Sequence, residues 1–170
     1  MKYLLFIVIL AAGVIAAGCV GGAKGPGVTA TPTPRIGNTT VPGTPVPLPS
    51  SSAEDFQKAN ALYSQSVDLA NAGNYGKALQ TADDALALNV SSMGPVIQSN
   101  RAGILVMLGR NTEAITAADI ALSSKDNLTA VFSVAYFNKG NALKNLGRLD
   151  EAKVAYANAY KLDNTLVPPI

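Results

Sequence analysis

The sequence of 170 residues contains no histidine, no tryptophan and a single cysteine. The absence of histidine excludes Ser-His-Asp and Cys-His catalytic sites, and it excludes metal sites built on imidazole or on pairs of thiolates. One cysteine also excludes an internal disulfide. The formal net charge of +2 is too small for a surface that binds nucleic acid. We therefore expect no metal, no cofactor and no nucleic-acid partner.

Acidic side chains offer no catalytic pair either. Asp83-Asp84 and Asp150-Glu151 are neighbours along predicted helices, and adjacent residues of a helix do not face each other. The Gly25-Pro26-Gly27 segment follows no strand and opens no helix, so it does not form a phosphate-binding loop. We expect a protein that binds a partner and is not an enzyme.

A charged residue and a long apolar run open the chain. Lys2 precedes fifteen uncharged residues, 3–17, in the pattern of a secretory signal. The run ends on Ala16-Ala17-Gly18 directly before Cys19, and such small residues let a chain lie extended in a peptidase cleft. This stretch resembles a lipoprotein lipobox, although position 16 more often holds leucine. The resemblance implies that residues 1–18 are a signal peptide and that Cys19 carries a lipid.

The same segment has an alternative interpretation as an uncleaved anchor helix. Residues 3–23 carry no charge and are almost long enough to span a bilayer. Both interpretations place the rest of the chain outside the cytoplasm, so we expect it at the extracytoplasmic face of the cell membrane.

A segment of low complexity follows the cysteine. Residues 20–52 contain seven prolines, six threonines, six glycines and three serines, which together make 22 of the 33 residues. Proline lacks a backbone donor and glycine is costly to order, so this composition does not build a core. Residues 19–52 are therefore predicted to be a disordered linker that carries the lipidated cysteine.

Three triplets match the acceptor pattern for N-linked glycans, Asn-x-Ser/Thr. One begins at Asn38 in the linker, and the others begin at Asn89 and Asn127 in predicted loops. Because we expect the chain to be exported, these three asparagines are candidate glycosylation sites.

Residues 53–170 have a different composition and an internal repeat. Gly73, Gly109 and Gly147 are each followed five residues later by an alanine, and these alanines are 36 and 38 residues apart. Further residues follow four and seven positions after each alanine, a spacing that places them on one helix face. These residues are Ala82 and Ala85, Ala118 and Ala121, and Tyr156 and Ala159.

Each unit of the repeat is predicted to contain two helices joined by a glycine turn. A glycine suits the left-handed conformation that ends a helix, and alanines let two helices approach closely. The first helices are predicted at 54–72, 95–108 and 130–146, and the second helices at 75–89, 111–123 and 149–162.

This pattern resembles the tetratricopeptide repeat, and the third unit matches it best. In that unit, Tyr136, Gly140, Leu143, Ala152, Tyr156 and Ala159 stand where the family has its large and small packing residues. The first unit matches at Leu62, Ser66, Leu69, Ala78, Ala82 and Ala85. The second unit keeps Ala102, Leu105, Ala114, Ala118 and Ala121, but Gln98 replaces a bulky packing residue there. In the third unit, Asn164 stands where the family usually has proline.

The resemblance implies an all-α fold, a right-handed superhelical stack of about three helix-turn-helix repeats. The repeats fall at about 59–90, 95–126 and 133–164. A plain helical bundle is the alternative. The last repeat is followed by no polar capping helix, so we expect Val154, Tyr160 and Leu162 to be partly exposed and available to a partner or a second copy.

In this family the first helices line a concave surface that binds peptides. Carried over to this sequence, that surface comprises Asn60, Tyr63, Val67, Val96, Ser99, Gly103, Val106, Met107, Phe137, Asn141, Lys144 and Asn145. Some family members hold a terminal carboxylate with paired cations, but Lys144 is the single cation of this set. We therefore expect no carboxylate clamp and a neutral or weakly apolar ligand.

The sequence thus predicts a membrane-anchored, surface-exposed module that binds a protein or peptide partner, with a role in scaffolding or assembly. Two other functions stay open. One is a surface lipoprotein that captures a solute or glycan, which requires an enclosed, aromatic-lined pocket. The other is an envelope component that associates with copies of itself.

Overall fold

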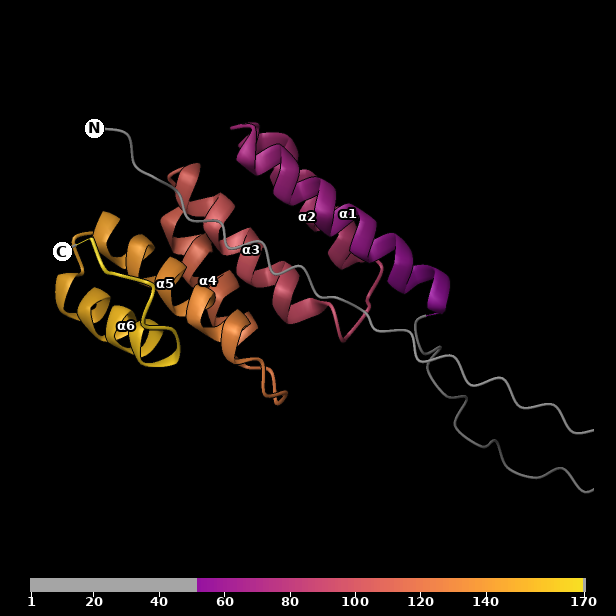
Figure 1. Ribbon diagram of the computed structural model, residues 1–170. Helices are drawn as coiled ribbons and strands as arrows, with labels where there is room; N and C mark the ends of the chain where they lie inside the picture. The colour runs from indigo at the N-terminus through magenta and orange to yellow at the C-terminus, as the bar shows by residue number, and fades with distance from the viewer. Residues whose placement is uncertain (1–51, 170) are drawn as a thin grey trace, which may run out of the picture. The chain divides into compact units, whose positions relative to one another are not determined.

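The computed structural model describes residues 52–169, and the regular secondary structure of this part consists of six helices. The helices are α1 (Ala53–Asn71), α2 (Tyr75–Ala87), α3 (Gly94–Met107), α4 (Asn111–Leu122), α5 (Thr129–Asn145) and α6 (Leu149–Leu162) (Figure 1). All six predicted helices are confirmed, and each boundary lies within two residues of its predicted place. None of the six has both the length and the apolar content that a membrane span needs.

Predictions for the first 51 residues lie outside the described part of the chain. They include the signal peptide, the lipid on Cys19, the linker and the glycan acceptor Asn38.

Glycine turns join the helices of each pair, as predicted. Gly73, Gly109 and Gly147 have φ angles of 78°, 73° and 75°, a left-handed conformation that a side chain would strain. In each turn the residue after the glycine donates its N–H to a carbonyl five residues back, as Asn74 does to Leu69 at 2.8 Å. This bond closes the end of the first helix in all three pairs and sets the direction of the second.

Small alanine side chains lie between the paired helices and let them pack closely. The alanines that recur in the repeat pattern are at most 1% exposed, namely Ala78, Ala82, Ala85, Ala114, Ala118, Ala121, Ala152 and Ala159. Larger side chains fill the remaining space, and Ile97, Leu105, Leu143 and Tyr156 are the bulkiest hydrophobic residues that are almost fully buried. The core is therefore a series of close helix contacts that enclose a few large side chains.

Successive pairs stack through a regular set of neighbours. The second helix of each pair packs on the first helix of the next, α2 on α3 and α4 on α5. α3 and α5 also lie along each other, whereas α1 touches α3 only sparsely. The first helices α1, α3 and α5 therefore follow one another on one side of the stack, and the second helices lie behind them (Figure 1).

A short non-helical tail, residues 163–169, follows α6. Asp163 turns it by accepting hydrogen bonds from the Thr165 backbone N–H at 2.9 Å and the Thr165 hydroxyl at 2.6 Å. The tail then buries Leu166, and the Lys144 ammonium donates a hydrogen bond to the Pro169 carbonyl. Figure 1 shows the tail turning back along α5 and α6. It therefore joins the end of the chain to the last helix pair.

The tail leaves much of α6 open to solvent. Val154, Tyr160 and Leu162 are 63%, 51% and 37% exposed, which confirms the prediction of partial exposure. Large apolar side chains at such exposure are a surface that a protein could cover.

Candidate functional site

The first helices present one continuous set of side chains on the side away from the second helices. Residues spaced by three or four positions share a helix face. On each first helix, the residues opposite the buried packing residues lie on the side away from the second helices. We call it the first-helix face, and every member is exposed or half-buried. Its members are Asn60, Ser64 and Asn71 on α1, Val96, Asn100, Gly103 and Met107 on α3, and Val134, Asn138, Asn141 and Asn145 on α5.

No member of the first-helix face is charged. One cation of α3 and one of α5 turn instead towards the preceding second helix. Arg101 of α3 pairs with Asp83 of α2 at 2.6 Å, and Lys139 of α5 pairs with Asp119 of α4 at the same distance. The face therefore offers amides and small apolar side chains to a ligand, and these two cations are neutralised beside it.

Two asparagines occupy equivalent places on this face, one repeat apart. The Asn100 side-chain nitrogen donates to the Ser66 hydroxyl at 3.2 Å, and that of Asn138 donates to the Ser99 carbonyl at 3.1 Å. Both amides are half-buried, and no donor within residues 52–169 bonds to their carbonyl oxygens. Each side chain is thus fixed by the preceding repeat, with an acceptor left over for a ligand.

Gly103 makes room for the second of these amides. A Cβ atom at Gly103 would lie 3.1 Å from the Asn138 side-chain nitrogen and 3.4 Å from its oxygen. Glycine here lets α3 and α5 approach closely enough for Asn138 to reach the Ser99 carbonyl. The hydrogen bond of Asn138 therefore depends on the absence of a side chain at Gly103.

Asn100 and Asn138 were not among the predicted surface residues. A signal for them was present, because they recur at the 38-residue spacing of the second and third units. Two residues that were predicted for the surface are instead buried, Val67 at 8% and Ser99 at 3% exposed. Ser99 faces α5, where its hydroxyl donates to the Val131 carbonyl at 3.3 Å, so it belongs to the packing between repeats.

Three members of the predicted surface, Phe137, Asn141 and Lys144, are instead engaged with the third repeat and the tail. The Phe137 ring packs on Tyr156 with centroids 5.6 Å apart, and the Asn141 oxygen accepts from the Tyr156 hydroxyl at 2.8 Å. Lys144 donates to Pro169 of the tail. The Asn141 nitrogen is left without a bond inside residues 52–169, so it is the donor that this group contributes to the first-helix face.

The remaining predicted residues lie at or near the face. Asn60 and Met107 are exposed, with Met107 at 37%, and Val96, Gly103 and Val106 are half-buried. Asn145 donates to the Asn111 side-chain oxygen at 3.1 Å, which ties the end of α5 to the start of α4. Tyr63 is half-buried against the core of the first two units, and burial raises its pKa.

Gln98 stands where the family has a bulky packing residue, and the structure shows the cost of the exchange. Its side-chain oxygen is buried and has no hydrogen-bond partner among the described residues. An unpaired buried amide oxygen is unfavourable, so the second repeat is held together less firmly at this point.

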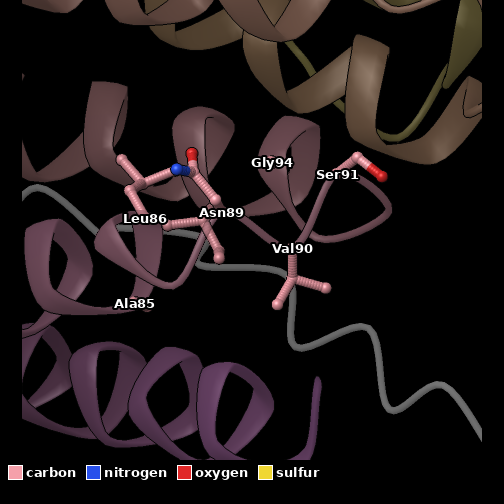
Figure 2. A pocket seen from close by; sticks show the side chains of 7 residues that line it. Ala85, Leu86, Asn89, Val90, Ser91 and Gly94 are labelled. Atoms are coloured by element: carbon pink, nitrogen blue, oxygen red, sulfur yellow. The ribbon is translucent and has the colours of Figure 1, made fainter. Parts of the chain in front are cut away.

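Two hollows in the described part of the chain are small. One is lined by Ala85, Leu86, Asn89, Val90, Ser91, Gly94 and Ile97 (Figure 2), and it holds about 200 Å³. The other lies between α5 and α6, is lined partly by Tyr136, Lys139 and Glu151, and also holds about 200 Å³. Pockets for small molecules are usually about 300–1,000 Å³, so neither hollow has the size of a solute site.

Comparison with known proteins assigns the same repeat. The sequence model of the family described as "Tetratricopeptide repeat" matches residues 133–166. Protein STIP1 homolog of Dictyostelium discoideum is 31% identical over 113 residues, which cover 66% of this chain and 19% of that protein. Small glutamine-rich tetratricopeptide repeat-containing protein 2 of Mycosarcoma maydis is 34% identical over 112 residues, 66% of this chain and 30% of that protein. The chain thus spans less than a third of either relative.

A solved structure shares the arrangement of helices. It is the "First TPR of Spaghetti (RPAP3) bound to HSP90 peptide SRMEEVD", with a TM-score of 0.55 and 25% identity. The match covers 64% of this chain and 81% of that one. The matched repeat, the relatives and the three helix pairs with glycine turns lead to one conclusion: the chain contains a tetratricopeptide repeat, and residues 52–169 have a fold like that of domains built from such repeats.

Proposed function

We propose that the repeat domain binds an extended, uncharged segment of a partner protein on its first-helix face. We further propose that a lipid on Cys19 holds the chain at the extracytoplasmic face of a membrane, where it acts in scaffolding or assembly. The observation that carries the first proposal is the pair of amides, Asn100 and Asn138, on a face without charge.

An extended peptide presents a backbone N–H and a backbone carbonyl at regular intervals. The free carbonyl oxygens of Asn100 and Asn138 can accept from such N–H groups, and the Asn141 nitrogen can donate to a carbonyl. Val96, Met107 and Val134 supply apolar contacts between these amides. This mixture suits a segment recognised mainly through its backbone and small side chains.

The comparison with a peptide complex supports binding and also indicates a different ligand. The peptide in the related structure, SRMEEVD, carries two glutamates and an aspartate. On this chain, Arg101 and Lys139 are paired with aspartates, and Lys144 is bonded to the tail. Arg101 and Lys139 are therefore neutralised, and the charge that Lys144 keeps is directed to the tail and not to the first-helix face. We expect a neutral segment to bind this face more tightly than an acidic one.

A solute receptor is the weaker candidate, because the two hollows described above are too small for it. Self-association has one observation in its favour, the exposed apolar side chains Val154 and Tyr160 of α6. The test of the proposed function therefore needs to separate a partner on the first-helix face from a second copy on α6.

Photo-cross-linking in cells of the native host makes this separation. One strain carries a benzophenone amino acid in place of Met107, on the first-helix face. A matched strain carries it in place of Ile120, which is 49% exposed on the second helix α4. We expect one partner protein to be cross-linked from position 107 and not from position 120, as identified by mass spectrometry.

Charge variants make the result specific. Val96→Lys places an unpaired cation on the first-helix face and is expected to abolish the cross-link from position 107, while Ile120→Lys leaves it unchanged. Both purified variants are checked for unaltered thermal unfolding. Identical products from both positions, or links only between copies of this chain, would contradict the proposed function.

The anchor is tested by one substitution. Cys19→Ser removes the sulfur to which a lipid would be attached, and we expect the chain to move from the membrane fraction to the soluble fraction. A single acyl chain binds membranes only marginally, so more than one chain on Cys19 is needed for stable anchoring. Unchanged membrane association of the variant, measured by fractionation and immunoblotting, would point to the uncleaved helix over residues 3–23.

A further inference from the structure

We propose that Asn89 and Asn127 are N-glycosylated, so that two glycans project from one edge of the repeat stack. The inference rests on the proposed location of the chain outside the cytoplasm. It is carried by the positions, the exposure and the side-chain directions of the two acceptor triplets.

Both triplets lie in loops between helix pairs. Asn89-Val90-Ser91 lies between α2 and α3, and Asn127-Leu128-Thr129 lies between α4 and α5, with Thr129 opening α5. These loops sit at the end of the stack where the first helices begin, near the lower middle of Figure 1. The glycine turns lie at the opposite end, so the two acceptors share one edge.

The two triplets expose the same positions. The asparagine and the hydroxyl residue of each triplet are exposed, whereas the middle residue is directed inwards. Val90 is 5% exposed, and Leu128 is half-buried. Figure 2 shows the Val90 side chain pointing away from the side chains of Asn89 and Ser91. The apolar middle residue thus anchors each loop and turns the two polar groups towards solvent.

A different local feature supports each of the two sites. Asn89 has a φ of 54°, just after the end of α2, which lifts it out of the helix. At the second site, the Thr129 hydroxyl donates to the Asn127 side-chain oxygen at 3.2 Å. The hydroxyl of the triplet therefore already lies beside the amide that would be modified.

The reaction is a group transfer from a lipid-linked oligosaccharide, the co-reactant. The asparagine side-chain nitrogen attacks C1 of the first sugar. A nitrogen–carbon bond forms, the bond between C1 and the phosphate oxygen breaks, and the lipid pyrophosphate leaves with the electron pair. The amide nitrogen loses one proton. The product is a bulky, hydrophilic group at the surface of an exported protein.

The arrangement leaves the proposed binding surface open. Neither asparagine lies on α1, α3 or α5, so the glycans project from the ends of the helices and not across the first-helix face. Glycosylation and partner binding are therefore expected to be compatible on one molecule.

Mass spectrometry of the full chain, purified from membranes of the native host, tests the proposal. Trypsin releases Asn89 in the peptide 78–101 and Asn127 in the peptide 126–139. We expect both peptides to carry the added mass of an oligosaccharide. Ser91→Ala and Thr129→Ala each remove the hydroxyl and keep the asparagine, so each is expected to abolish modification of its own peptide only.

Two control variants exclude an indirect effect. Ser92→Ala removes a neighbouring hydroxyl outside the triplet, and Thr129→Ser keeps the hydroxyl within it, so both are expected to retain the glycans. Unmodified peptides from the unsubstituted chain would overturn the proposal.

Protease added to intact cells shows whether unmodified peptides reflect the absence of glycosylation alone or a chain that is not located outside the cytoplasm. A chain that is digested from outside but unmodified overturns only the glycosylation. A chain that resists digestion in intact cells and is digested after lysis overturns both, because the transfer takes place outside the cytoplasm.

Discussion

Replacing Gly140 with alanine is expected to lower the free energy of unfolding by about 3 kcal/mol, the upper part of the usual range for an overpacked core. The new Cβ atom would lie 2.6 Å from both Cδ1 and Cε1 of the Tyr156 ring. The ring has nowhere to move, because Tyr156 is 1% exposed, packs on Phe137 and is bonded through its hydroxyl to Asn141. The better helix propensity of alanine offsets only about 1 kcal/mol of this cost.

Urea unfolding followed by circular dichroism measures the effect. The matched control is Gly76→Ala in α2, where a Cβ atom would meet no atom within 4 Å. That variant is expected to gain about 0.5–1 kcal/mol from helix propensity alone. Equal changes in the two variants would show that the contact between α5 and the Tyr156 ring is not a constraint on the fold.

Tyr156 is also expected to make the domain unstable in alkali. Burial raises the pKa of its hydroxyl to about 12, from the value of about 10 of an unfolded chain. Between these values the unfolded chain releases this proton while the folded chain keeps it, so stability falls as the pH rises. One pKa unit corresponds to about 1.4 kcal/mol, which gives a loss of roughly 2 kcal/mol between pH 10 and pH 12.

Tyr156→Phe isolates this contribution from the titration of lysines over the same range. At neutral pH the variant is expected to be less stable by about 1 kcal/mol, because the bond to Asn141 is lost. Between pH 10 and pH 12 its free energy of unfolding should fall less steeply than that of the unsubstituted chain. Urea unfolding at a series of pH values measures both slopes. Parallel slopes would mean that the hydroxyl ionises in the folded protein as readily as in the unfolded one.

The helices could be predicted from the sequence because their signals are local. Gly73, Gly109 and Gly147 end the first helices, and an alanine five residues later begins the buried side of the second. A backbone turn and a helix face depend on residues within one or two helical turns, so a single sequence contains all the information that they need.

The surface was harder to predict, because it depends on how closely neighbouring helices approach. The helical spacing predicted which side of the helix Val67 and Ser99 occupy, but it did not show that side chains of neighbouring helices bury both residues. The same spacing placed Lys144 on a free surface, whereas the tail returns to bond with it. Asn138 was missed because its role depends on a carbonyl of α3, 39 residues earlier in the chain. Contacts of this kind follow from the assembled fold and not from a pattern within one helix.

The ion pairs between repeats have a consequence for how this domain could be lengthened. Arg101 with Asp83 and Lys139 with Asp119 form the same joint twice, so an inserted copy of the second repeat would bring a matching cation and a matching carboxylate to its two neighbours. The amide contacts are less interchangeable. Asn138 bonds to a main-chain carbonyl, which every repeat possesses, whereas Asn100 needs the hydroxyl of Ser66. An inserted copy of the second repeat would therefore keep the ion pairs but would place one Asn100 against residue 102, which is alanine where the first repeat has Ser66, so this amide bond would be lost at the new contact.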